Sequence, residues 1–111
     1  MLSYSRHATP EIDVDELDGL LQKGSVHLLD VREDWEFKRR RVPGAISLPL
    51  GRLTARVAEL PRDKPYAVIC EIGSRSLAAT DFLLRQGFEG AASVRGGTGA
   101  WARTDRPTEM G

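Results

Sequence analysis

Apolar and polar positions along this chain follow two different periods. Short, nearly continuous apolar runs, such as residues 26–31 and 66–70, are typical of strands that are buried on both sides. Between these runs, apolar side chains recur every three or four residues, as in residues 14–21, which is the spacing of one helix face. Strands that alternate with amphipathic helices are typical of βαβ units. The pattern therefore predicts an α/β fold.

The expected sheet has about five strands and is mostly parallel. Strands of a parallel sheet are nearly continuous in apolar character because helices cover both faces, so we expect three layers, α/β/α. The expected strands are residues 11–13, 26–31, 45–48, 66–70 and 91–94. The expected helices follow Asp13, span 34–41, run through Leu53 to Leu60 and through Leu77 to Leu84, and begin a last turn at Ala100-Trp101.

Local signals set the ends of the first helix. Asp13 is a good N-cap, and Glu16, three residues later, completes a capping box. Lys23-Gly24 ends that helix. No repeat or linker divides the chain, so we expect one domain over residues 1–111, with its core in about 10–103 and a loose tail at 104–111.

Composition narrows the class of function. Of the 111 residues, 41% are hydrophobic, which is enough for a core without metal or disulfide staples. Basic and acidic residues number 16 each, and nonspecific nucleic-acid binding needs a basic excess, so it is not expected. No apolar run approaches the roughly 20 residues of a membrane span, and residues 1–7 lack the apolar core of a signal peptide. The expected location is the cytoplasm, away from membranes.

Cys70 is the single cysteine, which excludes an intramolecular disulfide and a Cys-rich zinc site. It lies where a predicted strand ends and a loop leads into a helix, and ligands of open α/β sheets bind at that edge. Backbone N–H groups of such a loop converge on one small space and hold an anion. The loop would favour the reactive thiolate, and it would equally hold a persulfide or an oxyanion.

The residues after Cys70 suit such a loop. Gly73 allows a tight curl, Arg75 adds a planar cationic fork, and Ser76 is expected to cap the helix. The plain alternative is that Cys70 fills an apolar position at a strand end, as free cysteines commonly do. The Gly-Ser-Arg-Ser sequence that leads into a helix favours the functional interpretation.

The sequence of residues 70–76, Cys-Glu-Ile-Gly-Ser-Arg-Ser, resembles the active-site loop of single-domain rhodaneses, a family of sulfurtransferases. Three further segments resemble rhodanese motifs in the same order, and the resemblance covers about residues 10–103. It implies the rhodanese-like fold. The three segments are Leu29-Asp30-Val31-Arg32-Glu33 with Glu36-Phe37, Val42-Pro43-Gly44-Ala45-Ile46 with Leu48-Pro49-Leu50, and Val94-Arg95-Gly96-Gly97 with Ala100-Trp101.

The resemblance also implies a persulfide cycle. Cys70 would take the outer sulfur of a donor such as thiosulfate or a persulfide and pass it to cyanide or a thiol, in a ping-pong reaction without a metal or organic cofactor. A sulfur-relay protein is a candidate partner. The family binds the sulfur with loop amides, which by position belong to Glu71, Ile72, Gly73, Ser74, Arg75 and Ser76.

Two positions depart from the rhodanese pattern. Arg40-Arg41 stand where the family commonly has Gly-His, in a basic run at 38–41 that is either a solvated helix end or a rim that steers anions. Glu71 follows the nucleophile, where many thiosulfate-active members have a basic or neutral residue. A carboxylate at that position should oppose a dianionic donor.

Other charged and aromatic residues are candidates for a supporting structural role around the Cys70 site. Asp30 and Arg32 are expected to form a structural pair at a strand end, because buried charges persist mainly when they are paired. Arg41 is a third candidate supporting residue. Trp35 and Trp101 are interpreted as packing anchors.

Two alternative functions stay open. A cysteine-dependent phosphatase or arsenate reductase typically has five residues between its Cys and its Arg, whereas four separate Cys70 from Arg75, which favours a sulfur-sized guest. A noncatalytic rhodanese-like module would carry or sense sulfur, or bind a protein. The retained Cys70 favours catalysis over that second alternative.

Overall fold

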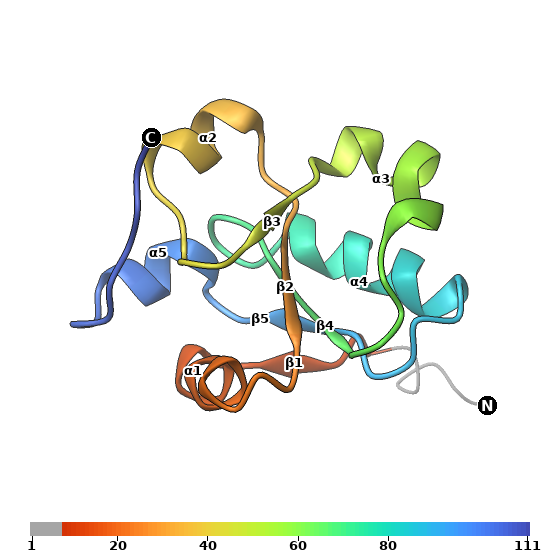
Figure 1. Cartoon of the computed structure of the whole chain (residues 1–111), viewed down its shortest axis with the longest axis horizontal. Helices are drawn as coiled ribbons and strands as arrows, with labels where there is room; N and C mark the ends of the chain where they lie inside the picture. Colours follow the sequence, from red (N-terminus) through yellow and green to blue (C-terminus); the bar gives the residue numbers. More distant parts are fainter. Residues whose placement is uncertain (1–7) are drawn as a thin grey trace.

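The computed structural model describes residues 8–111, which form a five-stranded sheet whose strands all pair in parallel, in the order β1-β5-β4-β2-β3 (Figure 1). This confirms the predicted α/β fold. The strands are β1 (Glu11–Ile12), β2 (His27–Asp30), β3 (Ile46–Ser47), β4 (Tyr66–Ile69) and β5 (Ala92–Val94). The helices are α1 (Val14–Gln22), α2 (Asp34–Arg39), α3 (Leu50–Arg56), the 3-10 turn η2 (Val57–Glu59), α4 (Arg75–Arg85) and α5 (Gly97–Ala102).

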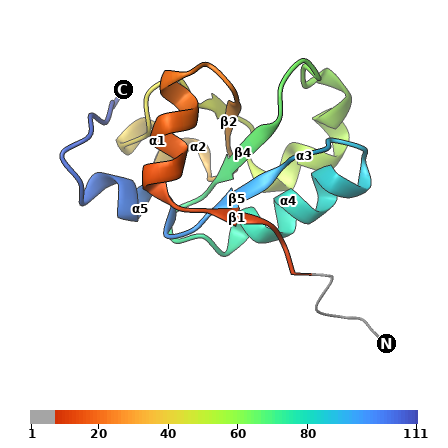
Figure 2. The same ribbon diagram turned by 90° about the horizontal axis from the view of Figure 1, so that it is seen from below.

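Two hydrophobic cores cover the two faces of the sheet, and successive residues of β4 contribute to them alternately. Val68 and Cys70 lie in the core that α3 and α4 complete, whereas Ala67 and Ile69 lie in the core that α1 and α5 complete. This alternation is the two-residue period of a strand. Figure 2 shows α1 and α5 on one side of the sheet and α3 and α4 on the other. All of β4 is buried, as its continuous apolar sequence predicts.

The starts of the first helix, α1, and of the last helix, α5, follow from local sequence signals. The predicted capping box is confirmed, since the Glu16 N–H donates to the Asp13 carboxylate at 2.8 Å and the Asp13 N–H donates to Glu16 at 2.9 Å. The last helix was expected from Ala100 but begins at Gly97. It begins there because Gly96, with a φ of 81°, turns the chain sharply out of β5.

Two other helices are shorter than the sequence predicts. The helix expected to reach Leu60 ends at Arg56 and tightens into the 3-10 turn η2. Pro61 accounts for this, because a residue before proline is driven out of the helical region, and Leu60 is extended. Helix α2 ends at Arg39 rather than at Arg41.

The C-terminal segment, residues 104–111, which the sequence predicts to be a loose tail, makes several contacts with the rest of the domain. Arg41 and Glu109 exchange two backbone hydrogen bonds of 2.9 Å, which require Arg41 to be extended and therefore end α2 early. The Trp101 indole N–H donates to the Pro107 carbonyl oxygen at 2.9 Å. Figure 1 shows this segment running alongside the chain that follows α2 and ending beside α2. The Arg106 guanidinium also pairs with Asp15 and Asp18 of α1, so both backbone and side-chain groups bind this segment.

Within residues 8–111, no helix is both long enough and apolar enough to cross a membrane. The signal-peptide argument concerns residues 1–7, which lie outside the described part of the chain.

Candidate functional site

Cys70 directly follows β4, at the edge of the sheet where the parallel strands β2 and β5 also end. Its side chain is fully buried and lies in the same core as Val68, as strand alternation requires. The loop of residues 71–74 then turns back over the sulfur, and α4 begins. This is the arrangement of strand, loop and helix that the sequence predicts.

Three polar groups contact the Cys70 sulfur. The backbone N–H of Gly73 donates to Sγ at 3.1 Å, the N–H of Ser76 donates at 3.3 Å, and the Ser76 hydroxyl oxygen lies 3.3 Å from Sγ. The Ser76 hydroxyl is also 2.7 Å from the hydroxyl of Ser93, which is equally buried. Donors that converge on a buried sulfur stabilise negative charge on it.

The loop brings two of its six candidate amides to the sulfur. Among the described residues, the amides of Gly73 and Ser76 make these bonds, and no bond from the amides of Glu71, Ile72, Ser74 or Arg75 reaches Sγ. The Ile72 side chain is directed to solvent and is 72% exposed. Contact with the sulfur therefore depends on the curl of the loop at Gly73, whose φ is 100°.

The start of α5 supports the loop from behind, which sequence reasoning missed. The N–H of Thr98 donates to the Cys70 carbonyl oxygen at 2.8 Å, and the N–H of Gly99 donates to the Glu71 oxygen at 3.0 Å. A Cβ at Gly97 would lie 2.6 Å from the Glu71 oxygen and would also collide with the Cys70 oxygen. The Gly96-Gly97 pair is the sequence signal for this close approach of α5 to the loop, because only glycine leaves room for the loop backbone.

Ser76 does not cap α4, which corrects the prediction. The N-cap position is Ser74, whose side chain makes no capping hydrogen bond, and Ser76 lies inside the first turn. The Ser76 hydroxyl is directed inward to Cys70 instead. A serine at this position therefore contacts the sulfur with both its amide and its side chain.

The Arg75 guanidinium is bound to a carboxylate rather than free for a substrate. Its Nη1 and Nη2 donate to the two oxygens of Glu36, each at 2.8 Å. This hydrogen bonding to Arg75 holds the pKa of Glu36 below its usual range. The bidentate pair ties the start of α4 to α2. Sequence reasoning assigned the Arg75 fork to the sulfur site, and it missed Glu36 as the partner.

Asp30 and Arg32 form the predicted buried pair. The Arg32 Nη2 donates to Asp30 at 2.8 Å, and Arg32 is only 2% exposed. The same guanidinium also donates to the Glu71 carboxylate at 3.1 Å and to the Arg40 carbonyl oxygen at 2.7 Å. Arg32 therefore links the end of β2, the residue after Cys70 and the segment after α2.

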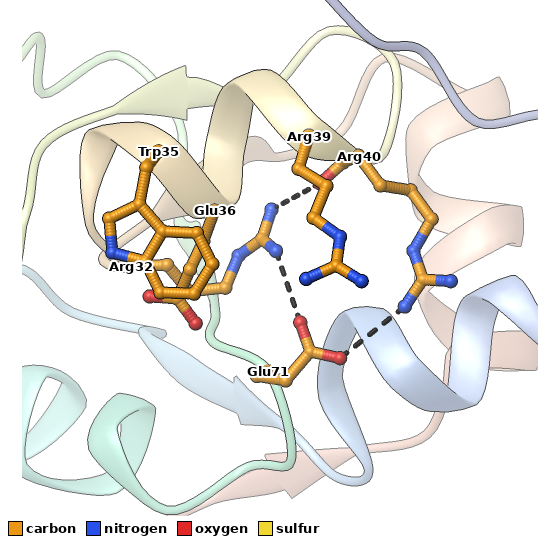
Figure 3. Close-up of a pocket in the computed structure, with 6 residues that line it drawn as sticks. All are labelled: Arg32, Trp35, Glu36, Arg39, Arg40 and Glu71. Atoms are coloured by element: carbon orange, nitrogen blue, oxygen red, sulfur yellow. Dashed lines mark hydrogen bonds and ion pairs between the residues drawn. The ribbon is translucent and has the colours of Figure 1, made fainter.

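A pocket of about 340 Å³ opens between α2 and the residue after Cys70 (Figure 3). In the figure Glu71 lies below the arginines, and its two oxygens accept from Arg32 and, at 3.4 Å, from Arg40. Arg39 and Arg40 of the basic run at 38–41 therefore form a rim of this pocket, and the run is not only a solvated helix end. The residues that line the pocket are Arg32, Trp35, Glu36, Arg39, Arg40 and Glu71.

Two of the sequence interpretations change. Arg41 does not line the pocket, because its guanidinium packs on the Phe37 ring at 4.7 Å and donates to the Gly111 backbone oxygen at 3.0 Å. Trp35 is 62% exposed and lines the pocket, so it is not a packing anchor. Trp101 is buried in the core with α1, as predicted.

Comparison with known proteins assigns these features to one family. Residues 13–104 match the family described as "Rhodanese-like domain". A protein of Allochromatium vinosum named "Sulfurtransferase" is 35% identical over 98 residues, which are 87% of this chain and 92% of that protein. A Vibrio cholerae protein named "Thiosulfate sulfurtransferase GlpE" is 32% identical, again over 98 residues, 88% of this chain and 92% of the other.

Solved structures agree with the sequence relatives. The crystal structure of a rhodanese-related protein from Thermoplasma volcanium superimposes with a TM-score of 0.83 at 32% identity. The superposition covers 92% of this chain and 99% of that one, so the two proteins share the whole fold and not only the loop after β4.

Proposed function

Because the chain belongs to the rhodanese-like domain family, we propose that it is a sulfurtransferase that carries sulfane sulfur on Cys70. The observation that carries the proposal is the arrangement at the sulfur, where two amides and one hydroxyl converge on Sγ at 3.1 to 3.3 Å. The names of relatives at 32 to 35% identity support sulfur transfer as the class of reaction.

Each step of the proposed cycle exchanges one S–S bond for another bond to sulfur. With thiosulfate, the Cys70 thiolate attacks the outer sulfur, a new S–S bond forms, and sulfite leaves with the electron pair of the broken bond. With an organic persulfide the leaving group is the thiolate of the donor. In the second step cyanide or a thiolate attacks the outer sulfur of the Cys70 persulfide, and the Cys70 thiolate is restored.

The residues around Cys70 have separate parts in this cycle. The amides of Gly73 and Ser76 would hold negative charge as it moves between Sγ and the added sulfur. The Ser76 hydroxyl can accept from the thiol or donate to the thiolate, and Ser93 is its partner in either case. The acceptor thiol can belong to a small molecule or to a sulfur-relay protein.

Loss of Cys70 tests the proposal. Wild type should gain one sulfur atom of mass on incubation with thiosulfate or a persulfide, lose it to cyanide and form thiocyanate. Cys70→Ser and Cys70→Ala should do neither while keeping the circular dichroism spectrum of wild type. Thiocyanate formation by either folded variant at the wild-type rate would refute the proposal.

The same assays separate the two alternatives. A noncatalytic carrier would accept the sulfur atom but would not turn over with cyanide. A phosphatase would hydrolyse an aryl phosphate in a Cys70-dependent way. The short loop and the Glu36 carboxylate that occupies both ends of the Arg75 fork argue against phosphatase activity, because the Arg75 guanidinium is already paired and is not free to bind a phosphoryl group.

A further inference from the structure

Three arginines surround one carboxylate in the pocket beside Cys70. Figure 3 shows the guanidinium groups of Arg32, Arg39 and Arg40 gathered over Glu71. Arg32 and Arg40 both donate to the Glu71 carboxylate. Glu71 belongs to the loop that follows Cys70, so its negative charge is on the reactive loop itself, whereas Arg39 and Arg40 lie at the end of α2.

The charges in this pocket do not cancel. Arg32 is shared between Asp30 and Glu71, and the Glu36 carboxylate is taken by Arg75. Among residues 8–111, no ion pair involves Arg39, and the 3.4 Å contact of Arg40 with Glu71 is long for a charged hydrogen bond. One positive charge is therefore in excess, on the exposed side of the pocket.

This order of charges distinguishes two kinds of sulfur donor. Thiosulfate has its negative charge on the group bonded directly to the transferred sulfur, so its charge would lie near Glu71. An organic persulfide transfers sulfur from an end that is neutral when protonated, and a carboxylate on its carbon chain can lie several bonds away. Such a carboxylate would reach the arginines while the sulfur faces the loop.

We propose that the pocket binds the carboxylate of a small organic persulfide through Arg39 and Arg40, and that Glu71 discriminates against donors charged at the sulfur. The proposal rests on the proposed function and specifies its donor. In the loading step the Cys70 thiolate attacks the outer sulfur of R–S–S–H, the S–S bond of the donor breaks, and the thiolate R–S⁻ leaves with the electron pair. That thiolate then takes the proton of the transferred sulfur, so no external oxidant or reductant is needed.

A matched pair of donors tests the role of the arginines. N-acetylcysteine persulfide carries the carboxylate, and N-acetylcysteine amide persulfide has the same carbon chain without it. We expect wild type to load Cys70 roughly fivefold faster from the carboxylate donor, which is the size of an ion pair at an exposed site. Loading is followed as the gain of one sulfur atom of mass, so no acceptor is involved.

Variants locate that preference in the pocket. Arg39→Gln and Arg40→Gln should each remove most of the preference by slowing the carboxylate donor alone. Arg52→Gln is the matched control, because Arg52 lies on α3 and pairs with Asp34 outside the pocket, and it should keep the preference of wild type. Equal slowing of both donors in Arg39→Gln and Arg40→Gln, or no slowing in either variant, would overturn the proposal.

Thiosulfate supplies the test of Glu71. Glu71→Gln keeps the shape of the side chain and should raise the loading rate from thiosulfate about fivefold, while the amide donor changes less than twofold. A thiosulfate rate that does not rise would contradict the role of Glu71. Failure of wild type to load from any donor would instead refute the proposed function, whereas equal loading from the matched pair would refute this inference and leave the function intact.

Discussion

The loop after Cys70 and the arginine segment at the end of α2, Arg39-Arg40, contribute to the same pocket, but they are held in different ways. Backbone groups hold the loop: the amides of Gly73 and Ser76 donate to the sulfur, and the amides of Thr98 and Gly99 hold the carbonyl groups of the loop. Side chains hold the arginine segment, through Arg32, together with the backbone pairing to the C-terminal segment.

This difference separates the residues that make the sulfur reactive from the residues that select the donor. A loop that is held by backbone bonds keeps its shape when neighbouring side chains change, so the same sulfur site can be combined with many rims. The rim consists of side chains that can be replaced one at a time, and Arg40-Arg41 in place of the common Gly-His is such a replacement. We expect changes to the loop support to abolish reactivity, and changes to the rim to alter the preference among donors.

The largest effect is expected from Gly97→Ala. The new Cβ would collide with the Glu71 oxygen, and Gly97 has a φ of 62°, which disfavours any side chain. We expect the free energy of unfolding to fall by about 3 kcal/mol and sulfur loading to fall at least 100-fold, because the loop must move. Urea unfolding and mass spectrometry measure the two effects.

Gly19→Ala is the control for that variant. Gly19 lies within α1, with no atom close to the position of an added Cβ and no positive φ. This variant should be more stable by about 0.5 to 1 kcal/mol and should load sulfur at the wild-type rate. If Gly97→Ala behaves like Gly19→Ala, the start of α5 does not support the loop.

The second prediction concerns Ser76→Ala, which removes the hydroxyl beside the sulfur and keeps the amide. Sulfur loading should fall about tenfold, the value of one hydrogen bond to a charged group at the lower end of its range. Ser74→Ala is the control, since the Ser74 side chain is exposed and makes no capping bond. Equal sulfur-loading rates for the two variants would mean that the backbone amides alone stabilise the negative charge on the sulfur.

How much of this could be predicted depends on the distance between partners in the sequence. The capping box at Asp13 and Glu16 and the loop after Cys70 are local, and the sequence predicts both. The bond between Arg75 and Glu36 joins residues 39 positions apart, and the bond between Arg41 and Gly111 joins residues 70 positions apart. Either arginine has several carboxylates or carbonyl groups to choose from, and only the packed fold selects one.

The third prediction concerns the C-terminal segment, which pairs with Arg41 after α2. Glu109→Pro removes the N–H that donates to the Arg41 carbonyl oxygen. The segment should detach from the end of α2, and Arg39 and Arg40 should lose their fixed positions. We expect the preference for the carboxylate donor to fall by about half or more, with sulfur loading from the amide donor unchanged, because an exposed ion pair is weak without a fixed geometry.

Glu109→Ala is the matched control for the proline variant. It keeps both backbone hydrogen bonds to Arg41 and removes a long side-chain contact of 3.6 Å from a carboxylate that is half exposed. The donor preference should therefore stay at the wild-type value. A preference that survives in Glu109→Pro would show that Arg32 alone positions the arginine segment.

The smallest effect is a pH dependence of the link between α2 and α4. Hydrogen bonding to Arg75 lowers the pKa of Glu36 in the folded protein, so the stability from this pair is fully present above the usual glutamate pKa of about 4.3 and is lost as the pH falls through the lower folded value. Glu36→Gln removes the charge that Arg75 binds. At about pH 7 the variant should be less stable than wild type by roughly 1 kcal/mol, because Arg75 is partly exposed and solvent weakens the pair. The difference between the two unfolding free energies should shrink steadily below about pH 4, as Glu36 of wild type is protonated.

Glu89→Gln is the control: Glu89 is exposed and has no ion pair among residues 8–111, so its variant should differ little from wild type at either pH. A stability difference for Glu36→Gln that stays constant between these pH values would mean that packing rather than charge joins the two helices.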